Sequence, residues 1–438
     1  GLGDVYKRQA DIKVDAKAID ADLTEATAAV EDLSLKAKGT QIEGNIRARN
    51  IFDPVPLADG KVRIQAAGLP EVLAALGQDP AKIPVKSLFA DTAFSSGKDF
   101  ITFQKLSAKA VLEGGKIVKP VDVKLDAGGT YHTAGKVLDL QQFSLEGPGA
   151  TVLGKIRAKD ITAKIPLVNG KIKLVAENVQ ALMKALGQDP ANMPLTRLAA
   201  DADLKSTADT VKIEPFVAKA TLEGDQVPGK MADVNLFTNA SLNIAQESLS
   251  LSNVSIQGMG LDMQGSVRGS QILDDPKLAG QMNIAPFDLR KLMKAMMMEV
   301  PATADPKALT RVSLKTDFSG GKDAFKMKNI KLMLDDSSVQ GDFEMAGFDR
   351  PSTAFNLTID GINADRYLEP KKKGEKPKPI TPGTAVASAA EQLPVDTMRK
   401  LKVNGNLLIG KLTVAGAKLN SVQLGLDAKD GKINLSPA

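Results

Sequence analysis

Two short stretches of this sequence have residue types that are found where proteins bind phosphate. Ser95-Ser96-Gly97-Lys98 and Ser319-Gly320-Gly321-Lys322 are similar to the end of a phosphate-binding loop. Such a loop needs another glycine five residues before the final one, and neither stretch has it. Both stretches lie between segments with a strand-like pattern. The sequence therefore predicts hairpin turns here, and no nucleotide site.

The remaining candidates for chemistry are few. Asp201 and Asp203 have the spacing of calcium ligands, but no glycine and no bidentate glutamate follow them as a calcium loop requires. His132 is the only histidine, and cysteine is absent, which excludes disulfides, thiolate zinc sites and cysteine nucleophiles. No Gly-x-Ser-x-Gly nucleophile motif occurs. We expect a protein that is not an enzyme and that uses no metal and no cofactor.

Composition excludes several other classes. Hydrophobic residues make up 43 % of the chain and charged residues 25 %, as in ordinary folded proteins. The net charge of +5 comes from lysines and arginines scattered between apolar residues, and aromatic residues are only 4 %. A nucleic-acid surface would be more densely basic and richer in aromatics. We interpret the charge as a solvated face, although a basic surface that meets anionic lipid remains open.

The strongest signal is an internal repeat of about 110 residues. Ala75–Pro80 recurs as Ala185–Pro190, and Gly44–Arg49 recurs in similar form as Gly154–Lys159. A third copy of the helical segment contains Leu292–Met296 at the same spacing. Several independent anchors at one spacing indicate a tandem repeat, in which each unit is one supersecondary structure.

Most of each unit alternates between apolar and polar residues. In residues 61–66, Val62 and Ile64 share one side while Lys61, Arg63 and Gln65 share the other. A period of two predicts strands with one apolar face. Glycine-containing segments separate the strands, and we predict turns at residues 58–60, 96–99, 169–170 and 429–431. The fold class expected is mainly β: an elongated, curved antiparallel sheet, or β-groove, made of tandem units.

One short helix is expected in each unit. The first begins at Pro70, the second has Asn178 as its N-cap, and the third begins near Asp288. The methionines that follow Leu292 suit a helix that fills gaps on the sheet, or a site for a flexible apolar ligand.

The expected organisation follows from the repeat and from two unusual segments. Residues 1–9 match nothing else and are interpreted as a non-native scar, and the chain as an internal fragment. Residues 365–396 are rich in lysine and proline, so we expect a flexible insertion with a short helix, either simply solvated or a basic tether to a membrane. The expected divisions are repeat unit 1 at 10–145, unit 2 at 146–256, unit 3 at 257–364, the insertion at 365–396, and C-terminal strands at 397–438.

A sheet with one apolar face must cover that face or bind something with it. If about 20 strands curl into a trough, an apolar groove of roughly 100 Å results at about 4.8 Å per strand. A long apolar ligand, such as a lipid acyl chain, fits such a groove. The residues expected to line it are the alternating apolar ones: Val62, Ile64, Ile172, Leu174, Leu412, Val414, Val422, Leu424, Leu426, Ile433 and Leu435.

Three stretches resemble the AsmA family of bacterial envelope proteins. They are Phe287–Met293 followed by Pro301–Leu309, Asp365–Pro370 before the insertion, and Leu401–Val414 with Ala428–Ile433. The resemblance covers most of residues 30–438. It implies a β-groove related to bridge-like lipid transfer proteins, in a periplasmic protein anchored to the inner membrane by a segment absent from this sequence.

The resemblance also implies a function. It suggests phospholipid transfer between inner and outer membranes or a role in outer-membrane assembly, with phospholipid acyl chains as ligands and envelope proteins as further partners. One alternative is a periplasmic scaffold or assembly factor that conducts no lipid and fills its apolar face with its own helices and with partner proteins. A β-solenoid adhesin is a third reading, but it predicts much shorter repeats.

Overall fold

The computed structural model describes residues 12–37, 39–53, 56–70, 84–114, 117–160, 167–190, 193–225, 227–296, 298–348, 351–370, 402–429 and 432–436. The chain divides into two compact units, residues 1–221 and 222–438. Each unit is described on its own.

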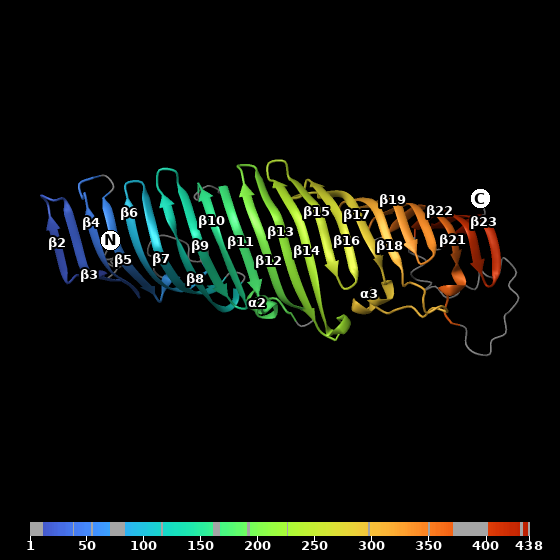
Figure 1. Cartoon of the computed structure of the whole chain (residues 1–438), viewed down its shortest axis with the longest axis horizontal. Helices are drawn as coiled ribbons and strands as arrows, with labels where there is room; N and C mark the ends of the chain where they lie inside the picture. Colours follow the sequence, from blue (N-terminus) through green and yellow to red (C-terminus); the bar gives the residue numbers. More distant parts are fainter. Residues whose placement is uncertain are drawn as a thin grey trace, which may run out of the picture. The chain divides into compact units, whose positions relative to one another are not determined.

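Unit 1 is built from antiparallel strands, and from β3 to β12 each strand pairs with its neighbours in sequence. These strands run side by side from blue to green in Figure 1. Their bounds are β1 Ile12–Asp15, β2 Ala18–Asp22, β3 Thr27–Ala37, β4 Thr40–Arg49, β5 Leu57–Ala66, β6 Val85–Gly97, β7 Phe100–Gly114, β8 Ile117–His132, β9 Val137–Gly147, β10 Ala150–Lys159, β11 Leu167–Ala176, β12 Leu195–Ser206 and β13 Thr210–Glu223.

Unit 2 continues in the same manner with one exception. Its strands are β14 Met231–Asn243, β15 Ser248–Gly258, β16 Leu261–Ser270, β17 Lys277–Phe287, β18 Val312–Gly320, β19 Ala324–Leu334, β20 Ser337–Ala346, β21 Ser352–Asn363, β22 Lys402–Val414, β23 Ala417–Lys429 and β24 Lys432–Ser436. The pair β21–β22 is parallel. A parallel pair needs a long crossover connection, which the chain between these two strands provides. The mainly β, curved sheet predicted from the alternation is confirmed, apart from this one parallel pair.

Two of the three expected helices lie in described residues. Helix α2, Val179–Ala185, has Asn178 as its N-cap, and helix α3, Leu289–Ala295, has Asp288. Each capping side chain accepts a hydrogen bond from a backbone N–H in the first turn, at 2.9 and 3.0 Å respectively. Both N-caps were predicted from the sequence. The helix predicted to begin at Pro70 lies, apart from its first residue, outside the described residues.

The predicted turns were right at some positions and wrong at others. The chain turns between β6 and β7 at Lys98 and Asp99, and between β18 and β19 after Gly320. Residues 58–60 and 169–170, predicted as turns, instead lie inside β5 and β11. A Cβ on Gly60 or Gly170 would come within 2.3 or 2.2 Å of a carbonyl oxygen on the adjacent strand. These glycines allow the backbones of two strands to approach closely, and they do not mark a chain reversal. The fourth predicted turn, at 429–431, lies largely outside the described residues.

Several strands contain a β-bulge at a polar residue with positive φ. Asp32 in β3 and Asn329 in β19 have φ of 49° and 54°, and the strand register shifts at both positions. The backbone N–H at each bulge donates to a side-chain oxygen on the next strand: Asn45 for Asp32 at 2.7 Å, and Asp342 for Asn329 at 3.0 Å. Each bulge therefore inserts a residue without leaving its N–H unpaired.

Candidate functional site

The strand register of unit 1 brings apolar residues together in continuous rows. One row crosses eleven strands, β1 and β3 to β12, and contains no polar side chain. Its members are Val14, Leu35, Ile42, Ile64, Ala90, Ala108, Leu125, Leu145, Val152, Leu174 and Ala200. Ile64 and Leu174, which are 110 residues apart and thus at the spacing of the predicted repeat, both belong to this row.

A second row runs beside the first from β3 to β12. It consists of Leu33, Gly44, Val62, Thr92, Leu106, Ala127, Phe143, Gly154, Ile172 and Ala202. Its only polar member is Thr92, whose hydroxyl donates to the backbone carbonyl of Ala93 at 3.4 Å. Together the two rows define the apolar face of unit 1.

Unit 2 has an apolar face of the same kind. One row crosses ten strands, β14 to β23: Leu236, Ile256, Met263, Ile284, Leu314, Leu332, Val339, Ile359, Ile409 and Val422. A second row, from β15 to β23, is richer in aromatic residues: Leu251, Val267, Gly280, Phe318, Met327, Phe343, Phe355, Gly405 and Leu426.

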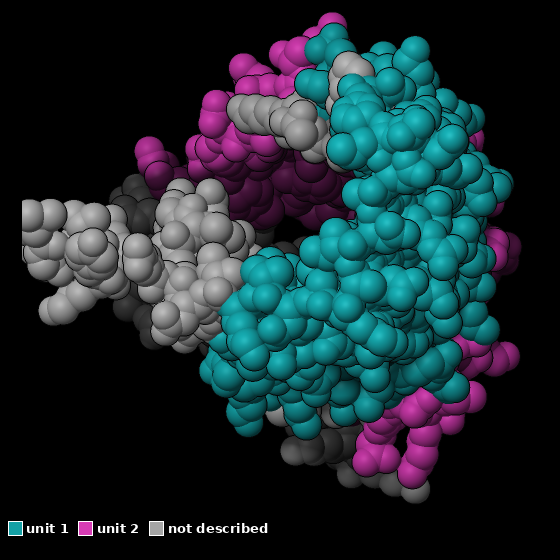
Figure 2. Space-filling view, turned by 90° about the vertical axis from the view of Figure 1, so that its left-hand side faces the viewer, with its two compact units in different colours: residues 1–221 teal, residues 222–438 magenta. Residues whose placement is uncertain are grey.

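The apolar faces are half-buried, although little of the described chain is placed to cover them. In the first row of unit 1 only Val14 and Leu145 are exposed, at 60 % and 41 %, and most of the others are half-buried. Among the described residues no large side chain is fully buried. The helices α2 and α3 have seven residues each, far too few to cover a sheet face of ten strands. Viewed end-on, unit 1 bends around a hollow (Figure 2).

The opposite face is polar and carries ion pairs between neighbouring strands. In unit 1 Arg63 pairs with Asp91 at 3.1 Å, and in unit 2 Lys326 pairs with Glu344 at 2.9 Å. Because these side chains are largely exposed, each pair adds little stability. They keep this face in water and so determine which side of the sheet is left for apolar contacts.

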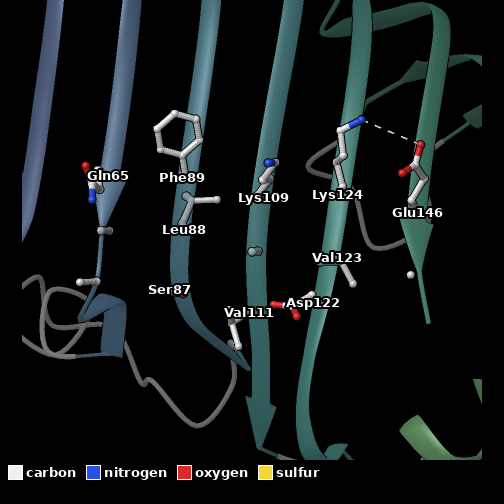
Figure 3. Close-up of a pocket in the computed structure, with 14 residues that line it drawn as sticks. Gln65, Ser87, Leu88, Phe89, Lys109, Val111, Asp122, Val123, Lys124 and Glu146 are labelled. Carbon is white, nitrogen blue, oxygen red and sulfur yellow. Dashed lines mark ion pairs between the residues drawn. The ribbon is translucent and has the colours of Figure 1, made fainter.

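A shallow hollow with a volume of about 560 Å³ lies toward one end of β5 to β9, and Figure 3 shows residues that line it. Across it lies a row of the polar face: Gln65, Phe89, Lys109, Lys124 and Glu146. The amine of Lys124 is 3.9 Å from the carboxylate of Glu146. A second hollow, of about 750 Å³ in unit 2, is also lined mainly by polar side chains such as Gln264, Asn283 and Lys315.

The structure places the residues predicted to line a groove as follows. Val62, Ile64, Ile172 and Leu174 belong to the two rows of unit 1. In unit 2, Val422 and Leu426 belong to the two rows, and Leu424 pairs with Leu407 between them. These seven side chains are half-buried.

The other four positions differ. After Ile409 the half-buried positions shift by one residue, so that Lys411 is exposed while Leu412 and Val414 are half-buried. Leu412 pairs with Ile362 and with Leu419, which is 45 % exposed, and therefore lies outside both rows. Ile433 and Leu435 lie in β24, opposite Ala428 and Leu426, but their side chains are outside the described part of the structure.

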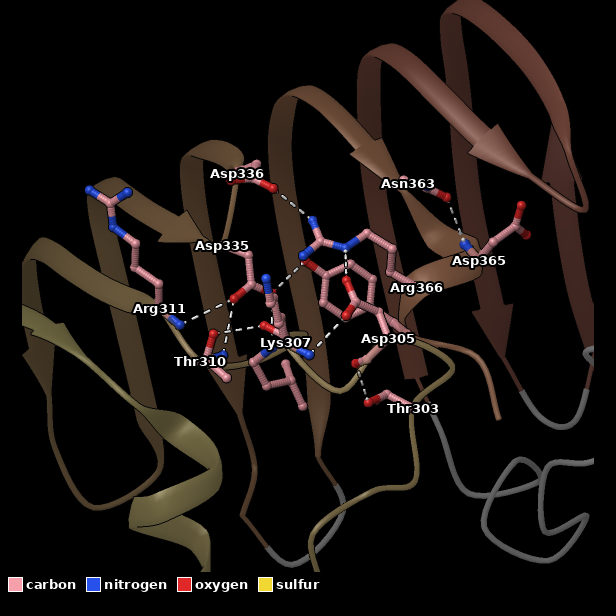
Figure 4. A network of polar contacts seen from close by, with 12 residues as sticks. Thr303, Asp305, Lys307, Thr310, Arg311, Asp335, Asp336, Asn363, Asp365 and Arg366 are labelled. Atoms are coloured by element: carbon pink, nitrogen blue, oxygen red, sulfur yellow. Dashed lines mark hydrogen bonds and ion pairs between the residues drawn. The ribbon is translucent and has the colours of Figure 1, made fainter. Parts of the chain in front are cut away.

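A network of polar contacts in unit 2 was missed by sequence reasoning. Asp335, at the turn after β19, is only 5 % exposed. Its carboxylate accepts hydrogen bonds from three successive backbone N–H groups, those of Leu309, Thr310 and Arg311, at 2.8, 3.0 and 3.1 Å. It also accepts one from the hydroxyl of Tyr367 at 2.8 Å. Figure 4 shows Thr310 and Arg311 beside Asp335, with dashed lines to its carboxylate.

Arg366 joins two further carboxylates to this network. Its Nε is 2.7 Å from Asp305, and its terminal nitrogen is 2.8 Å from Asp336. Next to it, Asp365 accepts backbone hydrogen bonds from Ala415 at 2.5 Å and Gly416 at 2.8 Å, in the turn between β22 and β23. The network therefore fastens the loop before β18, the turn after β19 and the β22–β23 turn to one short segment, the 3-10 helix Ala364–Arg366 and Tyr367.

The ionisation of this network suits a structural role. Burial opposes the charge of Asp335, but the backbone of Leu309, the hydroxyl of Tyr367 and the backbone of Arg311 and Thr310 outweigh it, so the pKa of Asp335 is lowered. Burial and the hydrogen bond to Asp335 raise the pKa of Tyr367 to about 12. The tyrosine is therefore a neutral donor and the aspartate a charged acceptor at neutral pH.

The sequence did contain a signal for the network. Asp365, Arg366 and Tyr367 are three polar residues in succession after a strand, and Asp335 and Asp336 are adjacent acids at a turn. Only their spatial pairing, across about 30 residues, could not be predicted.

No group of three or more histidine, aspartate or glutamate side chains in the described residues is arranged to hold a metal ion. Asp201 and Asp203 lie on β12, where Asp203 pairs with Lys171 at 3.5 Å. His132 is the last residue of β8. None of the helices in the described part of the chain is both long enough and apolar enough to cross a bilayer.

The fold and the two faces define a class: an open, mainly antiparallel β-sheet with one polar face and one apolar face that few of the described elements cover. Within this class, the chain belongs to the AsmA family, whose family model matches residues 153–438. Membership associates it with the bacterial envelope. Comparison with curated proteins and with solved structures finds no match for this chain.

Proposed function

We propose that the apolar face binds the acyl chains of phospholipids and that the protein moves these lipids through the periplasm between inner and outer membranes, without catalysis. The observation that carries this proposal is the unbroken row of apolar side chains, which are mostly half-buried although few elements of the described chain are placed to cover them. A side chain on an uncovered flat or convex surface would be largely exposed. We therefore take the apolar face to be the concave one.

The energetics favour a long apolar ligand. Burial of an acyl chain of about 16 carbons contributes on the order of 12 kcal/mol before entropic losses, at about 0.8 kcal/mol per CH₂. Each strand presents a similar apolar side chain in the row, so the binding free energy of an acyl chain is similar at successive strands. The acyl chain can therefore move along the row without being held in a deep energy minimum. The charged headgroup stays in water, since its burial would be costly.

The polar opposite face agrees with this role, and the AsmA membership supports its setting. The proposal places the protein in the periplasm, anchored to the inner membrane. Support of outer-membrane assembly would use the same lipid-binding face.

The test uses purified protein and a phospholipid with a photoreactive acyl chain. A crosslink is expected on the row that contains Ile64, and Ile64→Asp should reduce it strongly because a charge would then stand in the path of the chain. Gln65→Asp, one residue away on the polar face, is the matched control and should leave the crosslink unchanged. Ile64→Thr keeps a β-branched side chain and provides a milder variant if the aspartate disturbs folding.

Two results would overturn the proposal. One is a wild-type protein that takes up no lipid, neither in crosslinking nor as co-purifying phospholipid in native mass spectrometry; a lipid-free monomer would favour the scaffold alternative. The other is an unchanged crosslink in folded Ile64→Asp and Ile64→Thr.

A further inference from the structure

Three glycines of the apolar faces lie beneath a phenylalanine ring of a neighbouring strand. Phe143 covers Gly154 in unit 1, and in unit 2 Phe318 covers Gly280 and Phe355 covers Gly405. A Cβ on any of these glycines would come within 2.9 Å of a ring carbon. Aromatic rings that lie over strand glycines are a known way to pin strand register.

Gly405 differs from the other two glycines in what surrounds it. A Cβ on Gly154 would also meet the carbonyl oxygen of Lys171 at 2.4 Å, and one on Gly280 that of Ser266 at 2.0 Å. Close backbone approach alone therefore requires glycine at those positions. At Gly405 the three nearest atoms, at 2.6 to 2.7 Å, all belong to the ring of Phe355. The missing side chain makes room for this ring.

The position of Phe355 and Gly405 in the sheet determines where the ring lies relative to the apolar face. Phe355 and Gly405 lie opposite each other in β21 and β22, in the aromatic row between Phe343 and Leu426. Phe355 is half-buried and Gly405 is buried. Side chains of a strand otherwise stand roughly perpendicular to the sheet. A ring that lies over Gly405 stays close to the backbone of the sheet, whereas a ring displaced from Gly405 must project from the apolar face.

We infer that Gly405 controls how much room the apolar face of unit 2 leaves for an acyl chain, by holding the ring of Phe355 down. This inference rests on the proposed function and adds a residue that determines what can pass. A methyl group at position 405 lifts the ring into the path of the chain. Because the nearest atoms all belong to a side-chain ring, the ring can move while the backbone of β22 stays in place.

The experiment compares Gly405→Ala with wild-type protein, with the photoreactive phospholipid as probe and mass spectrometry to locate the crosslinks. Gly405→Ala should lose crosslinks in unit 2 several-fold. Gly361→Ala is the matched control: it lies in the same strand pair, and its added Cβ would make an ordinary contact, 3.4 Å from the Cβ of Lys411. The double variant Phe355→Leu with Gly405→Ala should restore the crosslinks, since a smaller side chain no longer projects.

The outcomes separate the inference from the proposed function. If wild-type protein takes up no lipid, the proposed function fails. If wild-type protein loads lipid and folded Gly405→Ala loads equally, or if the double variant fails to restore loading while it folds, the inference fails. A purely structural role for the pair would lower the melting temperature of Gly405→Ala and leave the loading of the folded protein unchanged.

Discussion

The hydroxyl of Tyr367 donates a hydrogen bond to the carboxylate of Asp335 at 2.8 Å. The two residues are 32 positions apart in sequence and belong to different elements. Their contact joins the turn after β19 to the segment that follows β21.

Tyr367→Phe should destabilise the protein by about 1–3 kcal/mol, because a buried charged acceptor loses one of its four donors. Urea denaturation measures the difference. Tyr131→Phe is the control: Tyr131 lies in β8, and its hydroxyl has no hydrogen-bond partner among the described residues. Equal stability of the two variants would show that the hydrogen bond contributes nothing.

The contribution of this pair should depend on pH at both extremes. The pKa of Asp335 is lowered from 3.8, so its stabilising effect is present above that pH and is lost as the pH falls below it. The pKa of Tyr367 is raised from 10.0 to about 12, so its effect is present below pH 10 and is lost as the pH rises toward 12. The stability difference between wild type and Tyr367→Phe should therefore be constant from pH 5 to about 9 and shrink on either side. A difference that stays the same at pH 11.5 would contradict this.

Arg366→Lys should loosen the loop before β18. The guanidinium reaches Asp305 and Asp336 with two different nitrogens, and a single ammonium cannot reproduce that fork. Faster backbone hydrogen exchange is expected at residues 304, 305 and 307–311, whose N–H groups donate within the loop and the network. Arg311→Lys changes an exposed arginine of the same region, and exchange there should stay as in wild type.

Thr316→Val tests whether the apolar face of unit 2 depends on its polar members. Thr316 is 2 % exposed, and its hydroxyl donates to the carbonyl oxygens of Lys328 and Asp317 at 2.9 and 3.0 Å. Valine has nearly the same shape but no donor, so a loss of about 1 kcal/mol in stability is expected. Lipid crosslinking of the folded variant should remain at the wild-type level, since the hydroxyl is turned to the backbone. A loss of crosslinking without a loss of stability would mean that the hydroxyl contacts the ligand.

Local patterns in the sequence predicted much of this fold. Alternation gave the strands and their apolar side, and Asn178 and Asp288 marked helix starts because capping is a property of one residue and the turn that follows it. The turns predicted at Gly60 and Gly170 were wrong because glycine is typical both of chain reversals and of places where two backbones approach closely. Only the neighbouring strand decides between the two.

The parts that could not be predicted depend on distant segments. The parallel pairing of β21 with β22 follows from a crossover whose return direction no local pattern encodes. The bulges at Asp32 and Asn329 shift the strand register. The shift changes which residues pair across the two strands but hardly changes the alternation of apolar and polar residues, so the sequence pattern did not reveal it. Leu412 and Val414 were expected to line the groove because they alternate with polar residues, but they lie three and five residues after Ile409, so a period of two does not place them in the row of Ile409.

Between β3 and β12, and again from β14 to β21, each strand is hydrogen-bonded to the strands just before and after it in the chain. The side chains presented at one hairpin and the length of the apolar row are therefore set by separate properties of the sequence. If the apolar face binds acyl chains as proposed, the residues of a single hairpin determine how firmly a chain is held there, while the number of hairpins determines how long the apolar row is. Gain or loss of a hairpin would then change the length of the row and leave the contacts at every remaining hairpin as they were.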